Sequence, residues 1–176
     1  INSMNSASYF FIVSDYAGSF NVGNADRVNR DQDDFVKDQN QINHGLVLET
    51  LKDDSSDELW IEFKSNTTRS YDRKYDAYKF FSPRIDLPQI YTISNYTKLS
   101  IDRQPETNTI QLGFACQTNG TYQISIQQFD GLASIEIEDT KTQKMHDLKS
   151  GDYEFDWQIG DSEERFILHL SATATE

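Results

Sequence analysis

The chain has 176 residues, and its 29 acidic against 16 basic side chains give a formal net charge of −13 at pH 7. This length can build one good hydrophobic core, so we expect one domain or at most two. The negative charge and the lack of any basic cluster argue against nucleic acid and anionic membrane surfaces as partners, because both attract positive charge.

The first 50 residues have the least regular pattern. The aromatic run Tyr9–Val13 and the short segment Ser19–Val22, separated by Gly18, predict a hairpin. Residues 24–41 are rich in Asp, Asn, Arg and Gln, which favours a long connection or one short helix. Strand character resumes at residues 45–50.

The middle of the chain contains the segment most suited to ligand binding. A strand is predicted at residues 59–64, after an acidic turn at residues 52–57. Residues 65–88 then mix polar and aromatic side chains without clean periodicity, and Pro83 and Pro88 close the segment. We expect these residues to form the functional loop, since binding residues concentrate on loops.

Regular strands are predicted from residue 89 onward, at residues 89–94 and 98–101 first. Asn119-Gly120 predicts a type I′ hairpin between two further strands. A second hairpin is expected across residues 139–142, and the last two strands, residues 153–159 and 165–171, are expected to meet across Gly160-Asp161.

The overall pattern predicts an all-β fold, because apolar and polar residues alternate with period two in five stretches. They are Leu59-Ile61-Phe63, Ile110-Leu112-Phe114-Cys116, Tyr122-Ile124-Ile126, Tyr153-Phe155-Trp157-Ile159 and Phe166-Leu168-Leu170. We expect an antiparallel β-sandwich, jelly-roll or Ig-like, with at most one short helix. Residues 1–171 form this single domain, in which residues 1–50 are the least sharply defined, and residues 172–176 begin a linker.

Enzyme motifs are missing from the sequence. It contains no G-x-S-x-G, H-E-x-x-H, P-loop or G-x-G-x-x-G pattern, so we expect a protein without catalytic activity. Two facing carboxylates of a glycosidase are the remaining enzyme hypothesis, with Glu49 and Glu62 as the acids to inspect. Cys116, the single cysteine, falls in an inward strand position and is expected to be a buried structural thiol.

Four residues are candidates for ligand binding: Trp60, Tyr71, Asp76 and Tyr78. Flat aromatic faces stack on sugar rings, so Trp60 and the tyrosines of the loop favour a carbohydrate platform. The alternative is that these rings pack against the loop. Asp72 and Asp76 offer oxygen ligands for calcium, but their spacing does not match an EF-hand and no metal site is assigned. A structural Asp76 would instead anchor the loop by hydrogen bonds to backbone groups.

The order of the motifs resembles a region of large secreted and surface proteins of Bacteroidota that precedes the C-terminal sorting domain of type IX secretion. The matching segments are Tyr9–Val13, Arg27-Val28, Leu59–Phe63, Tyr75–Lys79, Pro88–Ser94, Leu112–Phe114, Asn119–Tyr122, Ile137–Thr140 and Arg165–Leu170. The polar residues 5–8 depart from that pattern.

The resemblance implies a non-catalytic β-sandwich carried by many different exported proteins. The chain starts at Ile1 and has no apolar run near the ~20 residues of a membrane span, so we expect a piece of a longer extracellular or cell-surface protein without membrane insertion. The expected role is a structural, adhesive or spacer module, whose partners are other domains of the same chain, surface glycans or cell-surface proteins. A carbohydrate-binding module with a structural calcium is the alternative; no other cofactor is expected.

Overall fold

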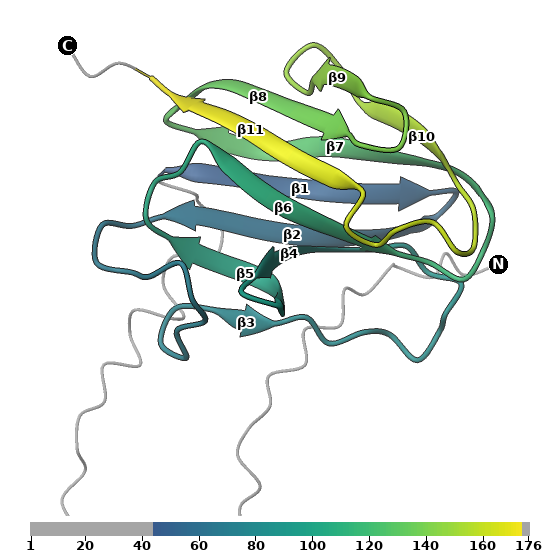
Figure 1. Ribbon diagram of the computed structural model, residues 1–176, viewed down its shortest axis with the longest axis horizontal. Helices are drawn as coiled ribbons and strands as arrows, with labels where there is room; N and C mark the ends of the chain where they lie inside the picture. The colour runs from purple at the N-terminus through teal and green to yellow at the C-terminus, as the bar shows by residue number, and fades with distance from the viewer. Residues whose placement is uncertain (1–43, 174–176) are drawn as a thin grey trace, which may run out of the picture. The chain divides into compact units, whose positions relative to one another are not determined.

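The computed structural model describes residues 44–173, which form β-strands and, within that range, no helix. The strands are shown in Figure 1. In chain order they are β1 (Gly45–Lys52), β2 (Ser55–Phe63), β3 (Ala77–Tyr78), β4 (Gln89–Ser94), β5 (Thr97–Gln104), β6 (Thr109–Ala115), β7 (Gly120–Asp130), β8 (Leu132–Asp139), β9 (Lys144–Asp147), β10 (Tyr153–Trp157) and β11 (Phe166–Ala172).

All of these strands belong to one hydrogen-bonded sheet, in the order β10-β7-β1-β2-β5-β4-β6-β11-β8-β9, with β3 paired to β5. Every neighbouring pair is antiparallel except β2 and β5, which run parallel. The sheet curls until β10, at one end, lies beside the β8–β9 hairpin at the other (Figure 1). It is therefore a nearly closed, barrel-like sheet.

Strand β5 is where the sheet changes partners. Leu99 pairs with Thr92 of β4 and with Tyr78 of β3, whereas Ile101 pairs with Trp60 of β2 and with β3. A strand has only two edges. One edge of β5 is paired with β3, and the other is paired first with β4 and then with β2. The inward side chains shift at the same point: Leu99 is buried, and the next buried residue is three positions later.

The core fills the inside of the curled sheet. Successive strand side chains point to opposite faces, so the alternating apolar positions all project inward. Phe114 lies among three other aromatic rings, with centroid distances of 5.1 Å to Tyr122, 5.1 Å to Phe155 and 4.8 Å to Trp157. The buried thiol predicted at Cys116 is confirmed, and the Tyr122 hydroxyl donates a hydrogen bond of 3.1 Å to its sulfur.

The all-β prediction is confirmed for residues 44–173, but the strands are not divided into the two clear sheets of a sandwich. Two hairpin predictions are wrong. Strand β6 pairs with β4 and β11, not with β7, and β10 and β11 do not pair with each other. The Asn119 side chain instead accepts a hydrogen bond of 2.7 Å from the Ile159 amide, so it joins two connections across the sheet.

Several predictions lie outside the described residues. They are the hairpin at residues 9–22, the connection at residues 24–41 and most of the linker at residues 172–176, although β11 itself extends to Ala172. The two-residue strand β3 was not predicted, because it is too short for an alternating pattern. The part of the chain that the structure describes has no helix suited to cross a membrane.

The β4–β5 hairpin turns through two residues with left-handed backbone angles, Asn95 at φ 49° and Tyr96 at φ 65°. This is the geometry of a type I′ turn, in which glycine is favoured at the second position. A tyrosine at this position is destabilised by the clash of its Cβ atom with the backbone. Its side chain is 97% exposed, so packing contacts do not offset that cost.

We expect Tyr96→Gly to stabilise the protein by about 1 kcal/mol, because glycine adopts positive φ without the clash of a Cβ atom. Urea denaturation measures the change. Asp54→Gly is the control, since Asp54 lies in the β1–β2 turn but does not have a positive φ; it should not stabilise. Equal effects of the two substitutions would contradict this account of the turn.

Candidate functional site

Trp60 lies half-buried on the outer face of β2, as its alternation with buried neighbours predicts. In the ladder, Trp60, Ile101 and Ala77 form one rung across β2, β5 and β3, so their side chains share a face of the sheet. The loop of residues 65–88 contributes β3 to this rung. Strand β5 separates this part of the loop from the tryptophan.

Tyr71 and Tyr78 form a stacked pair, with ring centroids 4.1 Å apart and planes inclined by 21°. Tyr78 is 46% exposed, and Tyr71 is half-buried. Among residues 44–173 no ring contact joins Trp60 to either tyrosine. Two of the predicted ligand-binding residues thus come together, while their role in binding stays a prediction.

Asp76 anchors the loop to the sheet, as expected of a structural residue at this position. One carboxylate oxygen accepts a hydrogen bond of 2.6 Å from the Asp72 amide, and the other accepts one of 2.9 Å from the Arg103 amide of β5. Burial raises the pKa of Asp76 above its usual range, although both hydrogen bonds act in the opposite direction. The side chain therefore links the loop to the β5 backbone.

Replacing Asp76 by Ala should lower stability by about 1 to 3 kcal/mol, because two partly buried amides lose their acceptor. Ligand affinity should not change. Asp76→Asn keeps one acceptor oxygen and should cost less. An unchanged free energy of unfolding for Asp76→Ala in chemical denaturation would show that the loop does not depend on this side chain.

The described range holds no arranged metal cluster, and the two acids named for a glycosidase have separate partners. Residues 44–173 contain no group of three His, Cys, Asp or Glu side chains positioned to hold a metal ion. Glu62 accepts a hydrogen bond of 2.6 Å from the Arg103 guanidinium, and Glu49 accepts one of 2.6 Å from the Gln127 amide. Each acid has its own partner. Calcium binding stays a prediction.

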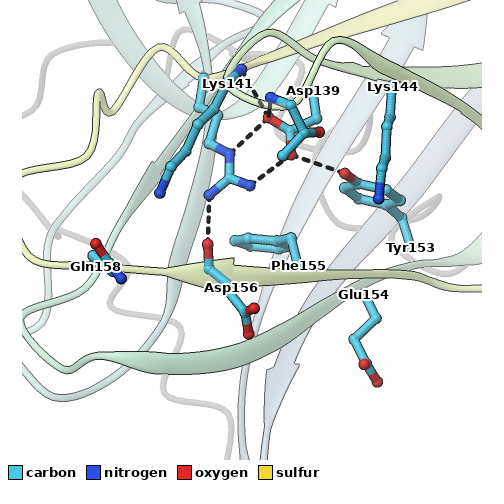
Figure 2. Close-up of a pocket in the computed structure, with 10 residues that line it drawn as sticks. Asp139, Lys141, Lys144, Tyr153, Glu154, Phe155, Asp156 and Gln158 are labelled. Carbon is cyan, nitrogen blue, oxygen red and sulfur yellow. Dashed lines mark hydrogen bonds and ion pairs between the residues drawn. The ribbon is translucent and has the colours of Figure 1, made fainter.

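The gap between β10 and the β8–β9 hairpin, which we call the seam, is bridged by a cluster of buried polar side chains (Figure 2). Arg165, directly before β11, donates two hydrogen bonds to the Asp139 carboxylate of β8, at 2.7 and 2.5 Å. The Tyr153 hydroxyl of β10 donates to the same carboxylate at 2.8 Å. A third guanidinium contact, of 2.7 Å, reaches the Asp156 carbonyl of β10.

The buried charges of Arg165 and Asp139 at the seam are compensated by each other and by hydrogen bonds. Arg165 and Asp139 are 2% and 0% exposed, and the guanidinium lies 5.1 Å from the ring centroids of both Phe155 and Phe166. Burial by itself raises the pKa of Asp139, but hydrogen bonds from Arg165 and Tyr153 hold it well below its usual range. The carboxylate is therefore ionised and paired. A pocket of about 350 Å³ lies over this cluster.

Arg165→Met should destabilise the protein by about 3 to 5 kcal/mol, because it leaves the Asp139 charge buried without a partner. The double variant Arg165→Met/Asp139→Leu should recover part of the loss, because the buried charge is gone but the Lys141 amide and the Tyr153 hydroxyl lose their acceptor. Stability from the ionised pair is present above pH ~4 and is lost as the pH falls below it, since the pKa of Asp139 is lowered on folding.

Urea denaturation at pH 7 and pH 3 measures both effects. Arg84→Ala is the control, because the Arg84–Asp86 ion pair is exposed and its loss should be close to neutral. A single Arg165 variant as stable as the control would contradict the closing role of the pair.

A second buried carboxylate, Asp102 of β5, has a different environment. It is 3% exposed, and within residues 44–173 no Lys, Arg or His side chain forms an ion pair with it. The Gln104 side-chain amide donates to it at 3.3 Å. The Thr92 hydroxyl lies near enough to lower its pKa, but burial dominates and raises that pKa to about 6. Thr92 Oγ1 is itself buried and makes no hydrogen bond of ordinary geometry.

Asp102→Asn should raise stability at pH 7.5 by about 1 to 3 kcal/mol, because the shift from 3.8 to about 6 disfavours the charged form by 1.36 kcal/mol per unit. The pKa of Asp102 is raised on folding, so the parent chain has its full stability below pH ~4. It loses stability as the pH rises through about 6, because the folded state resists ionisation of this carboxyl. Denaturant melts at pH 4 and pH 7.5 test this. A gain of equal size at both pH values would contradict it.

Sequence reasoning missed both buried carboxylates. Asp139 and Arg165 each lie in a quoted motif, Ile137–Thr140 and Arg165–Leu170, but their contact spans 26 positions. Asp102 follows the predicted strand 98–101, and a period-two pattern starting at Leu99 would point it outward. The only sign in the sequence that Asp102 could be buried was its position directly after a predicted strand.

The comparisons with known proteins give two similarities. Residues 2–170 match the family described as "Domain of unknown function (DUF8693)". Over 130 residues, 70% of this chain, the sequence is 30% identical to the minor fimbrium subunit Mfa5 of Porphyromonas gingivalis. The matched segment spans about a tenth of that protein's length. No solved structure is significantly similar to the chain.

Proposed function

We propose, since this chain belongs to the DUF8693 family, that it serves as a non-catalytic structural or adhesive module of a surface protein. The observation that carries the proposal is the similarity to a minor fimbrium subunit. There, the similar segment is one small part of a much longer protein, as expected of a module that is combined with other domains.

The structure supports this proposal through its ionisable groups. At the seam, Asp139, Tyr153 and Arg165 hold the strands together through hydrogen bonds to one another and to the backbone, and Arg165 also pairs with Asp161. Arginine, carboxylate and tyrosine groups in such a network stabilise a fold rather than hold a proton ready for transfer.

The proposed location is extracellular or at the cell surface, and the proposed partners are neighbouring domains of the same protein, cell-surface proteins or surface glycans. Export by the type IX pathway is part of this proposal, which rests on the resemblance of the motif order. A fimbrial relative is consistent with assembly alongside other chains or domains.

An adhesion assay tests the proposal. Beads coated with the folded chain should be retained on bacterial or host cells more strongly than beads coated with the Arg165→Met variant above its melting temperature. In parallel, the folded chain should not hydrolyse chromogenic glycosides, esters or peptides. Turnover that is lost on unfolding would contradict a non-catalytic module, and equal retention of folded and unfolded chain would contradict adhesion.

A carbohydrate-binding module is the second candidate, favoured by the partly exposed stack of Tyr71 and Tyr78. In affinity electrophoresis with soluble polysaccharides, Tyr78→Ala should reduce retardation because the stacking face is lost. Tyr75→Ala is the matched control, since the Tyr75 hydroxyl accepts a hydrogen bond from Asn66 within the same loop. Repeating the assay with EDTA tests the calcium ion of this hypothesis.

A further inference from the structure

A pocket of about 240 Å³ opens where β4 and β6 separate. These strands pair from Gln89↔Ala115 to Thr92↔Leu112, after which β4 pairs only with β5 as far as the hairpin turn. The space between Ile93–Asn95 and Thr109–Gln111 is left as a wedge, with Asp102 and Gln104 of β5 also lining it. Thus the change of strand partners produces the pocket.

The lining of this pocket is rich in neutral hydrogen-bonding groups. Hydroxyls, amides, one carboxylate and one guanidinium line it together with the apolar side chains of Ile93 and Ile110. The hydroxyl and amide residues are Ser70, Ser94, Thr107, Thr109, Asn95, Gln104 and Gln111. Arg69, at the exposed side, donates to the Thr107 hydroxyl at 3.2 Å and is the lining cation.

One buried polar group of this lining, Asp102, has unused hydrogen-bonding capacity. The Asp102 carboxylate accepts one side-chain hydrogen bond, from Gln104, although an ionised carboxylate has about four acceptor sites. Burying such groups without partners is costly, and the same chain shows at Asp139 how completely a buried carboxylate can be paired.

We propose that this pocket binds a hydroxyl-rich ligand of monosaccharide size, whose hydroxyls donate hydrogen bonds to Asp102. Hydroxyls both donate and accept, so they match a lining of amides, hydroxyls and one charge of each sign. An organic cation would meet Arg69 on entry, and an anion would meet Asp102. The volume lies below the ~300 Å³ at which pockets for drug-sized ligands begin, which fits a single ring.

This inference goes beyond the proposed module function and does not depend on it. It also concerns a different place from the Tyr71–Tyr78 stack, since neither tyrosine lines the pocket. The two sites make separable predictions.

The test is a titration of the isotope-labelled 176-residue chain, followed by amide chemical shifts, with D-glucose, D-galactose, D-mannose, L-fucose and N-acetyl-D-glucosamine. Each sugar is added to about 50 mM, because a small ligand held by a few hydrogen bonds binds weakly. At least one sugar should shift the amides of residues 92–95, 102–104 and 109–111. Asp102→Asn should weaken its binding at least about tenfold, as expected when a charged acceptor is lost.

The control is Asp152→Asn, which makes the same charge change at an exposed position and should leave the affinity unchanged. Asp102→Asn should melt no lower than the parent chain at pH 7.5, so its loss of affinity is not a loss of fold. The proposal is overturned if no sugar shifts the pocket residues, if shifts map to residues 71–78 instead, or if Asp102→Asn binds as the parent does. Binding of n-butylammonium in the pocket without binding of any sugar also overturns it.

Discussion

The two ends of the curled sheet meet through side chains rather than through a backbone ladder, and the Asp139–Arg165 pair lies at the centre of that contact. The guanidinium reaches β8 through the carboxylate and β10 through a backbone carbonyl, while the Tyr153 hydroxyl and the Lys141 amide also donate to the carboxylate. An unpaired charge in this position would be costly, so the pair favours the curled arrangement over an open one. The aromatic core inside the sheet stays covered as a result.

Asp102 and Asp139 show two outcomes for a buried carboxylate in one fold. Asp139 has a cation and a hydroxyl directed at it, and its ionised form is favoured; Asp102 has an amide and a hydroxyl nearby, and its ionised form is disfavoured. Residues at binding sites often lower the stability of the protein that carries them. Asp102, which has no ion pair among residues 44–173, fits this pattern because it lines a pocket.

The sequence predicted the parts of the fold that depend on local alternation. Leu59, Ile61 and Phe63 are buried on one face of β2, and β4 has the predicted bounds. Strand pairing was less accessible, since the sheet order places β11 between β6 and β8 through contacts distant in sequence. Asn119-Gly120 illustrates the limit: the turn signal is strong, but the flanking strands pair elsewhere and the closing contacts decide the topology.

The candidate site was predicted only in part for the same reason. Three of the candidates, Tyr71, Asp76 and Tyr78, lie close together in the chain. In the structure the two tyrosine rings stack, and Asp76 anchors the loop to β5. Asp102 was missed because the inward register of β5 shifts where its partner changes from β4 to β2, which no local pattern encodes. Pairing between remote segments thus sets both the seam and the pocket.

The most direct test of the closing role of Asp139–Arg165 is amide hydrogen exchange of Arg165→Met compared with the parent chain. The account predicts faster exchange in β8, β9 and β10, at the seam, while β2 and β5, in the middle of the strand order, keep more of their protection. Uniform loss of protection across all strands, or none at all, would contradict the claim that this pair specifically joins the two ends of the sheet.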